Sequence, residues 1–373
     1  MTDTVADWVD LVHERYPPAH AAEWDRVGLQ VGDPAWPVAR VLVALDVTSA
    51  VIAEAADGPP TLVAAHHPLL FRPLTRLTPD TAAGRVALAA ASARVAVLAA
   101  HTNLDVATDG AGTSEPIMRA LGITDAAPLT SEADDAGQVK LVTFVPPDHV
   151  GVVLDALAAA GAGVIGAYER CSFRVRGTGT FRPGQAAAPY SGQVGVDNEE
   201  VEERLEIVVP HARLGAAVAA LWAAHPYDEV AYDLHPLLAP PRAGFGRVGT
   251  LAPPVPLVEV AERVRERLPA PSLRFAGAPD HSIRMVAAVG GSGGRLVEAA
   301  LTAGADVLIT GDLGHHPVLD ALERGLALID AGHHATEHAA MGPWLERLQE
   351  AARQRSLSAE LLASTVSTAP WAG

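Results

Sequence analysis

Cysteine is nearly absent from this chain of 373 residues, which contains only Cys171. An intramolecular disulfide and a cysteine-rich zinc module are therefore excluded, and we expect a reducing, cytoplasmic location. The chain also lacks a run of eighteen apolar residues and the basic, apolar start of a signal peptide, so we predict a soluble protein with no membrane partner. Its formal net charge is −17, and it has no long basic run. Nucleic acid is therefore disfavoured as a partner, because phosphates require a basic face.

Apolar runs of strand length alternate with alanine-rich helical stretches in the first and last thirds of the chain. Thr61–Ala65 is followed by a helical stretch around Thr81–Ala91, and Val307–Thr310 is followed by another at Pro317–Arg324. This alternation predicts βαβ units and an α/β fold with largely parallel sheets. Near the C-terminus we expect one long helix from about His334 to Ala352, and then a tail that starts as a helix at Leu357.

The middle of the chain has a different pattern. From Val139 to about Leu238, strands and helices are predicted in the order β-α-β-β-α-β, which is typical of a ferredoxin-like unit. A polar, acidic segment precedes it, and a proline-containing segment, 239–244, follows it. We therefore predict an outer domain formed by residues 1–132 and 244–373, interrupted by an inserted domain at 138–238.

Four segments rich in histidine each follow an apolar run, and together they hold eight of the fifteen histidines. In open α/β sheets the carboxyl ends of the strands form the edge where ligands bind. Imidazole and carboxylate groups bind zinc, iron and manganese, so this coincidence predicts a metal site of undetermined metal identity. The segments are Ala65-His66-His67-Pro68, His101-Thr102-Asn103-Leu104-Asp105, Thr310-Gly311-Asp312-Leu313-Gly314-His315-His316 and Gly332-His333-His334-Ala335-Thr336-Glu337-His338.

Each segment by itself also has an ordinary structural interpretation. His66 and His67 would point to opposite faces of a regular strand, but Pro68 ends the ladder and lets both rings turn towards one place. In the last segment, His333 and Glu337 share one helix face at a spacing of four residues. His334 and His338 share the neighbouring face, so spacing does not choose between these pairs.

The turn Gly290–Gly294 joins a predicted strand to a predicted helix. Backbone N–H groups in such a turn can bind a phosphate. The turn lacks the lysine of a Walker motif and the third glycine of a dinucleotide fingerprint, so a tight strand–helix connection is the favoured interpretation.

The segment Glu23-Trp24-Asp25-Arg26-Val27-Gly28-Leu29-Gln30-Val31-Gly32 resembles the opening signature of the Nif-three-like dinuclear-metal family, whose members are called GTP cyclohydrolase 1 type 2 homologues. The four histidine segments follow in that family's order. The resemblance implies a two-lobed Nif-three-like α/β fold with mixed or parallel sheets, interrupted by the ferredoxin-like (α+β) insert. The insert itself looks like the CutA-like or PII-like domain of longer bacterial members.

The resemblance also implies roles for individual residues. It implies two divalent metal ions per subunit, zinc, iron or manganese, with Asp105 as the bridging ligand. It places His101 and His316 as further site histidines that act in catalysis, as outer ligands or proton-transfer groups, and it implies a homohexamer. The implied metal ligands are His66, His67, Asp105, His333 and Glu337.

Two functions are compatible with such a centre. The first is a metal-dependent, GTP cyclohydrolase-like hydrolase of a nucleotide-like or phosphorylated small molecule, since two cations can activate water and bind an anionic substrate. The alternative is a non-catalytic metal-binding protein with a regulatory or interaction role, which the inserted domain favours.

Overall fold

The computed structural model describes residues 2–130, 138–166, 168–237, 244–268 and 270–371. The chain divides into a larger unit, Met1–Glu132 with Pro241–Gly373, and a smaller unit, Ala133–Pro240. The two predicted linkers, 131–137 and 239–244, lie outside the described residues except for Gly244. In the described part of the chain, no helix is long and apolar enough to cross a membrane.

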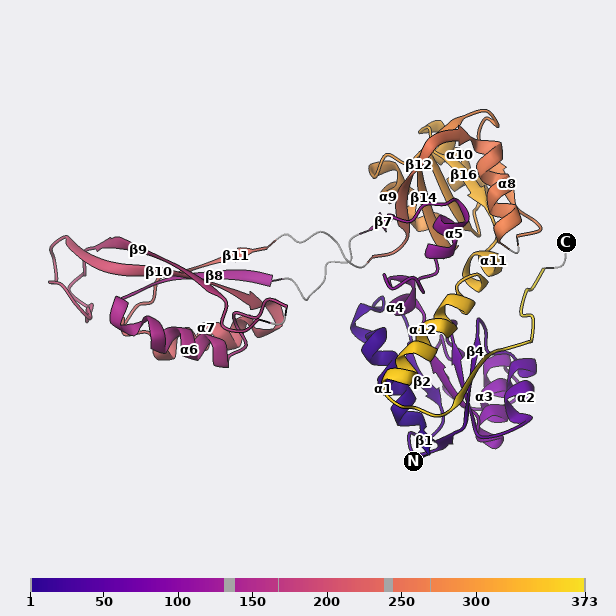
Figure 1. Cartoon of the computed structure of the whole chain (residues 1–373), viewed down its shortest axis with the longest axis horizontal. Helices are drawn as coiled ribbons and strands as arrows, with labels where there is room; N and C mark the ends of the chain where they lie inside the picture. Colours follow the sequence, from indigo (N-terminus) through magenta and orange to yellow (C-terminus); the bar gives the residue numbers. More distant parts are fainter. Residues whose placement is uncertain (1, 131–137, 167, 238–243, 269, 372–373) are drawn as a thin grey trace. The chain divides into compact units, whose positions relative to one another are not determined.

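The first sheet of the larger unit has five strands, and all neighbouring pairs are parallel except β2–β6. Val41 and Val43 face one layer of helices, while Leu42 and Ala44 face the other. Both faces are buried, which explains why these strands are continuous apolar runs. The strand order is β17 (Glu360–Ala363), β4 (Arg40–Ala44), β5 (Thr61–Ala65), β6 (Ala96–Ala99), β2 (Gly28–Val31). One face of the sheet is covered by α1 (Val5–Arg15) and α12 (Met341–Gln354), and the other by α2 (Ser49–Ala56) and α3 (Ala82–Ser92) (Figure 1).

The second sheet of the larger unit has six strands and is mixed, with a parallel centre formed by β14, β15 and β16. Helices again cover both faces, so each face has its own apolar core. The strand order is β13 (Arg274–Ala276), β16 (Ala327–Asp330), β15 (Val307–Gly311), β14 (Ser282–Ser292), β12 (Arg247–Pro256), β7 (Ala127–Pro128). One face of this sheet carries α5 (Glu115–Ala120) and α8 (Leu257–Arg267), and the other carries α9 (Val297–Thr302) and α10 (His315–Glu323).

The smaller unit has one four-stranded antiparallel sheet with two helices packed on one face. Leu141 and Val145 of β8 and Leu205 of β10 point into its core with Leu157 and Leu221 of the helices. In chain order the elements are β8 (Gln138–Val145), α6 (Val150–Ala159), β9 (Ser172–Phe181), β10 (Asn198–Pro210), α7 (Leu214–Ala224) and β11 (Tyr232–Pro236), and the sheet order is β11-β8-β10-β9.

Two sequence-based predictions near the C-terminus are wrong. The long helix expected from His334 is two helices, α11 (His333–His338) and α12 (Met341–Gln354). Pro343 explains the break, because proline has no N–H to donate and its ring clashes with the carbonyl four residues earlier. The tail does not begin as a helix: β17 pairs in parallel with β4, so sheet pairing overrides the local pattern.

Candidate metal centre

The cluster of histidines and carboxylates is built where strands of both sheets of the larger unit end. His66 and His67 follow β5, and their backbone N–H groups still donate to the carbonyls of Ala44 and Leu45. Their rings nevertheless lie together, with centroids 4.9 Å apart, as expected if Pro68 ends the strand. His101 follows β6 and precedes α4 (Thr102–Asp105), and α11 follows β16. The carboxyl ends of strands far apart in the chain therefore supply one site.

One group of ligand atoms converges on Glu337, which is only 4% exposed. Its Oε2 lies 3.0 Å from Nε2 of His67 and 3.0 Å from Nε2 of His333, and these two nitrogens are 3.3 Å apart. Oε2 is buried without a hydrogen bond of acceptable geometry. Ligand atoms around a single ion with bonds of about 2 Å have this spacing, so the three side chains fit a divalent cation.

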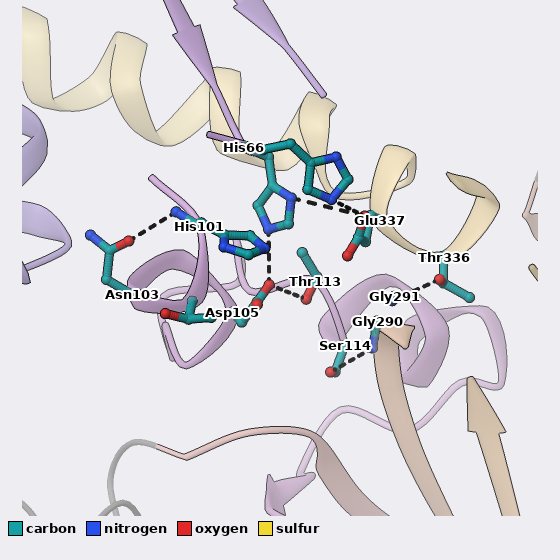
Figure 2. A network of polar contacts seen from close by, with 12 residues as sticks. His66, His101, Asn103, Asp105, Thr113, Ser114, Gly290, Gly291, Thr336 and Glu337 are labelled. Carbon is teal, nitrogen blue, oxygen red and sulfur yellow. Dashed lines mark hydrogen bonds and ion pairs between the residues drawn. The ribbon is translucent and has the colours of Figure 1, made fainter. Parts of the chain in front are cut away.

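A second group shares His67 with the first and consists of His66, His67 and His101. His66 is fully buried; its Nε2 lies 3.0 Å from Oδ1 of Asp105, which also accepts a hydrogen bond from Thr113 at 2.7 Å (Figure 2). Its Nδ1 has no hydrogen-bond partner and lies 3.9 Å from Glu337. A buried imidazole nitrogen without a partner is costly in a dry site, and a metal ion would satisfy it.

Three of these histidines are oriented by carboxylates that bind the far side of the ring. Nδ1 of His67 lies 2.8 Å from Asp46, Nδ1 of His101 lies 2.8 Å from Asp25, and Nδ1 of His333 lies 2.7 Å from Asp312. Such a partner fixes the ring and leaves Nε2 free to bind a metal. Asp25 is itself held by the backbone N–H of Thr102 at 3.0 Å and by its hydroxyl.

The charges of the site are coupled. Burial alone would raise the pKa of Glu337, but the nearby imidazoles of His66, His333 and His67 lower it well below its ordinary value. Burial would lower the pKa of His67, but Asp46 and Glu337 raise it to about 10. The carboxylate of Glu337, 3.0 Å from Nε2, raises the pKa of His333 to about 9, against the effect of burial. Metal binding to these imidazoles would therefore compete with protons.

The predicted turn Gly290–Gly294, whose first three residues are the end of β14, is a tight support for the cluster. N–H groups of the turn donate to hydroxyls of the protein: Gly290 to Ser114 at 3.1 Å, Gly291 to Thr336 at 3.0 Å and Gly293 to Thr310 at 2.8 Å (Figure 2 shows the first two). These three N–H groups therefore already donate to the protein's own hydroxyls and do not point at a ligand. Through them the turn holds β14 against the helix that carries Glu337. This supports the tight connection over a phosphate loop.

The predicted site residues separate into those the fold brings together and those it does not. The five predicted ligands and His101 lie in the cluster, which selects His333 and Glu337 over the alternative pair. The rings of His334 and His338 stack on each other instead, with centroids 5.1 Å apart. His316 is exposed on α10 with its ring against His315, and it is not part of either ligand group found among the described residues.

Asp25, Asp46 and Asp312 are absent from the sequence-based predictions of site residues. The sequence nevertheless marks each of them: Asp25 lies in the opening signature, Asp46 directly follows the apolar run Val41–Leu45, and Asp312 lies in a histidine segment. A cavity of about 1560 Å³ borders two of them, Asp46 and Asp312, together with His67, His333 and the tail residues 364–371.

The sequence is similar to one known protein family and to relatives that share one name. Residues 3–370 match the family described as Duf34/NIF3 (NGG1p interacting factor 3). The chain is 39% identical over 367 residues to the GTP cyclohydrolase 1 type 2 homolog of Halalkalibacterium halodurans, with 97% of each chain covered. It is 40% identical over 328 residues to the protein of the same name from Bacillus subtilis, covering 88% of this chain and 87% of the other.

Solved structures show the same likeness. A Bacillus cereus protein related to NIF3 is 35% identical with a TM-score of 0.74, and the match covers all of both chains. Staphylococcus aureus protein SA1388 is 29% identical with a TM-score of 0.83, and the match covers 100% of this chain and 99% of the other. The mixed α/β fold with several mixed sheets is therefore shared with these structures over the whole chain.

Proposed function

This chain belongs to the Duf34/NIF3 family, and on that premise we propose that it binds two divalent metal ions per subunit, zinc, iron or manganese. The observation that carries the proposal is the pair of ligand groups that share His67. The converging Nε2 atoms, the orienting carboxylates and the unpartnered Nδ1 of His66 support it. The proposed ligands are His66, His67, Asp105, His333 and Glu337, with Asp105 as the bridging carboxylate.

We further propose that the protein is a metal-dependent hydrolase of a nucleotide-like or phosphorylated small molecule, as the name of its relatives suggests. Two bound cations would supply Lewis-acid polarisation of a phosphoryl or carbonyl oxygen. Among the chain's own residues, Asp25 holds Nδ1 of His101 and thereby leaves Nε2 free to act as an outer metal ligand or to exchange a proton. The role of His316 in catalysis stays a prediction, because its side chain is exposed on α10.

One observation favours the alternative function, a metal-binding regulatory or interaction protein without turnover. The smaller unit has its own core, and its β-α-β-β-α-β order with sheet order β11-β8-β10-β9 is that of a ferredoxin-like domain. We propose that this unit is the CutA-like or PII-like insert and that the protein assembles as a homohexamer. Native mass spectrometry tests the assembly directly.

The deciding experiment measures metal and turnover in the same preparations. The protein is purified without an affinity nickel column, and its metal content is determined by elemental analysis before and after loading with manganese, iron or zinc. We expect about two ions per chain and hydrolysis within a panel of nucleotides and phosphoesters. His66→Ala and Asp105→Asn should lose the bound metal and the hydrolysis. His281→Ala, a change of an exposed histidine, should keep the metal and the hydrolysis.

The outcomes separate the two functions. Two ions per chain with no hydrolysis by the wild type would support the regulatory function. Hydrolysis that persists unchanged in His66→Ala and Asp105→Asn would show that the activity is a contaminant. An ion count that does not fall in these variants would contradict the metal site itself.

A further inference from the structure

Two exposed aromatic side chains lie beside the candidate metal centre. Trp24 is 43% exposed and Phe71 is 45% exposed, whereas Trp8 and Trp344 are completely buried. The rings of Trp24 and Phe71 meet edge to face, with centroids 5.9 Å apart and an angle of 67° between their planes. Adjacent exposed aromatics next to a polar cluster are typical of a ligand-binding surface.

Both aromatic rings contact His101, and through it the metal cluster. The centroid of His101 lies 6.1 Å from that of Trp24 and 6.4 Å from that of Phe71. The same ring lies 5.0 Å from His66 and 5.5 Å from His67. The imidazole of His101 therefore contacts both the aromatic pair and the other histidines of its ligand group.

The aromatic pair lies close along the chain to residues that build the metal site. Trp24 directly precedes Asp25, whose carboxylate holds His101. Phe71 lies four residues after His67. The backbone that carries each ring therefore continues into the cluster, which limits how far the rings can lie from it.

A cation completes this surface. The guanidinium of Arg295 lies 5.3 Å from the ring centroid of Trp24, and the side chain is exposed. Arg295 belongs to the 3-10 turn Gly294–Leu296, which follows the glycine turn that supports Glu337. In a chain with a net charge of −17, an exposed arginine at this place gives local attraction for an anion. Guanidinium also suits phosphate, which it binds through two parallel hydrogen bonds.

We propose that Trp24, Phe71 and Arg295 form the recognition site for an anionic substrate that carries a planar aromatic ring. The ring stacks on the aromatic pair, and the anionic group pairs with Arg295, so that the compound lies beside His101. A nucleobase linked to phosphate has both features, whereas a sugar phosphate has only the second. This inference rests on the proposed function, since it assigns the substrate class of the same metal centre.

The test is binding, measured by titration calorimetry on the metal-loaded full chain. The probes are guanosine monophosphate, guanosine and ribose 5-phosphate. We expect Trp24→Ala and Phe71→Ala each to weaken binding of guanosine monophosphate by about tenfold, since base–aromatic stacking contributes that much. Neither should change binding of ribose 5-phosphate. Arg295→Gln should weaken binding of both phosphates and leave that of guanosine unchanged.

Controls separate recognition from folding. Trp222→Ala removes a tryptophan of similar exposure, 45%, on α7 of the smaller unit, and should bind guanosine monophosphate as the wild type does. Trp24→Phe keeps a ring and should retain most of the affinity. Circular dichroism and metal content of each variant must match the wild type, because Trp24 adjoins Asp25.

The results also separate this inference from the proposed hydrolysis. Binding of guanosine monophosphate that depends on Trp24 and Phe71, without any turnover, would support the recognition site and contradict the hydrolase. Hydrolysis of a non-aromatic phosphoester, together with equal guanosine monophosphate affinity in wild type, Trp24→Ala and Phe71→Ala, would overturn the recognition site alone. Failure of the wild type to bind guanosine monophosphate would overturn it as well.

Discussion

Replacing Gly291 with alanine should disable the metal centre without a change of any metal ligand. Gly291 has φ +68°, and an added Cβ would lie well inside van der Waals contact with Oε1 of Glu337, 3.0 Å from its Cδ and 3.5 Å from Nε2 of His333. Glu337 is 4% exposed and its Oε2 is enclosed by two imidazoles, so the carboxylate must move out of the ligand group. We expect metal affinity to fall by at least about tenfold, the lower end of what disturbing a ligand's support costs.

Gly304 gives a matched control for this change. It has φ +72°, and an added Cβ there would meet nothing within 4 Å. Both alanines occupy the left-handed region, so each should lower the free energy of unfolding of the metal-free protein by roughly 1–2 kcal/mol. Only Gly291→Ala should also lose metal affinity. Urea unfolding in the presence of a chelator measures the first effect, and competition with a chromophoric chelator measures the second. Equal metal affinities in the two variants would refute the reasoning.

Three further predictions concern the groups around the ligands. Asp46→Asn and Asp25→Asn remove the anionic partners of His67 and His101. We expect each substitution to weaken metal binding by about 10–100-fold in chelator competition. Wild-type metal affinity in both variants would contradict the orienting role of these carboxylates. Thr368→Val removes the tail hydroxyl that donates to Asp46 and should weaken metal binding by less than about tenfold, with recovery in Thr368→Ser; a loss that serine does not restore would indicate a packing effect instead. His101→Ala should lower the metal content measured by elemental analysis, whereas His316→Ala should retain it, and loss of metal in the latter would contradict its exposed place on α10.

Local sequence patterns predicted much of the fold because they report burial. The runs Thr61–Ala65 and Val307–Thr310 were evident as apolar strands, and they correspond to β5 and β15. The break between α11 and α12 was missed because the helical pattern continues through Pro343, and the pattern does not register a lost hydrogen bond. The strand at Glu360–Ala363 was missed because a four-residue edge strand is defined by its pairing with β4, which lies more than 300 residues earlier.

The composition of the candidate site followed from the sequence, since histidines at strand ends are visible without a structure. Which ring nitrogen faces the ligand group was not visible. Asp46 and Asp312 are unremarkable as residues, and only strand pairing within each sheet, β4 with β5 and β15 with β16, places them behind His67 and His333. The contact between Arg295 and Trp24 is likewise invisible in the sequence, because Arg295 lies in a turn about 270 positions away.

The sequence by itself determined the residue types that favour a metal site, the α/β character and the different pattern of the middle segment, because these depend on side-chain chemistry and on local periodicity. Spacing left open whether His333 and Glu337 or His334 and His338 join His66 and His67; the family resemblance implied the first pair, and only the tertiary structure gives the physical reason. The two pairs have the same spacing on one short helix, so their difference lies only in which face of α11 is turned towards the ends of β5 and β6. That orientation is set by packing across both sheets, which no local pattern records.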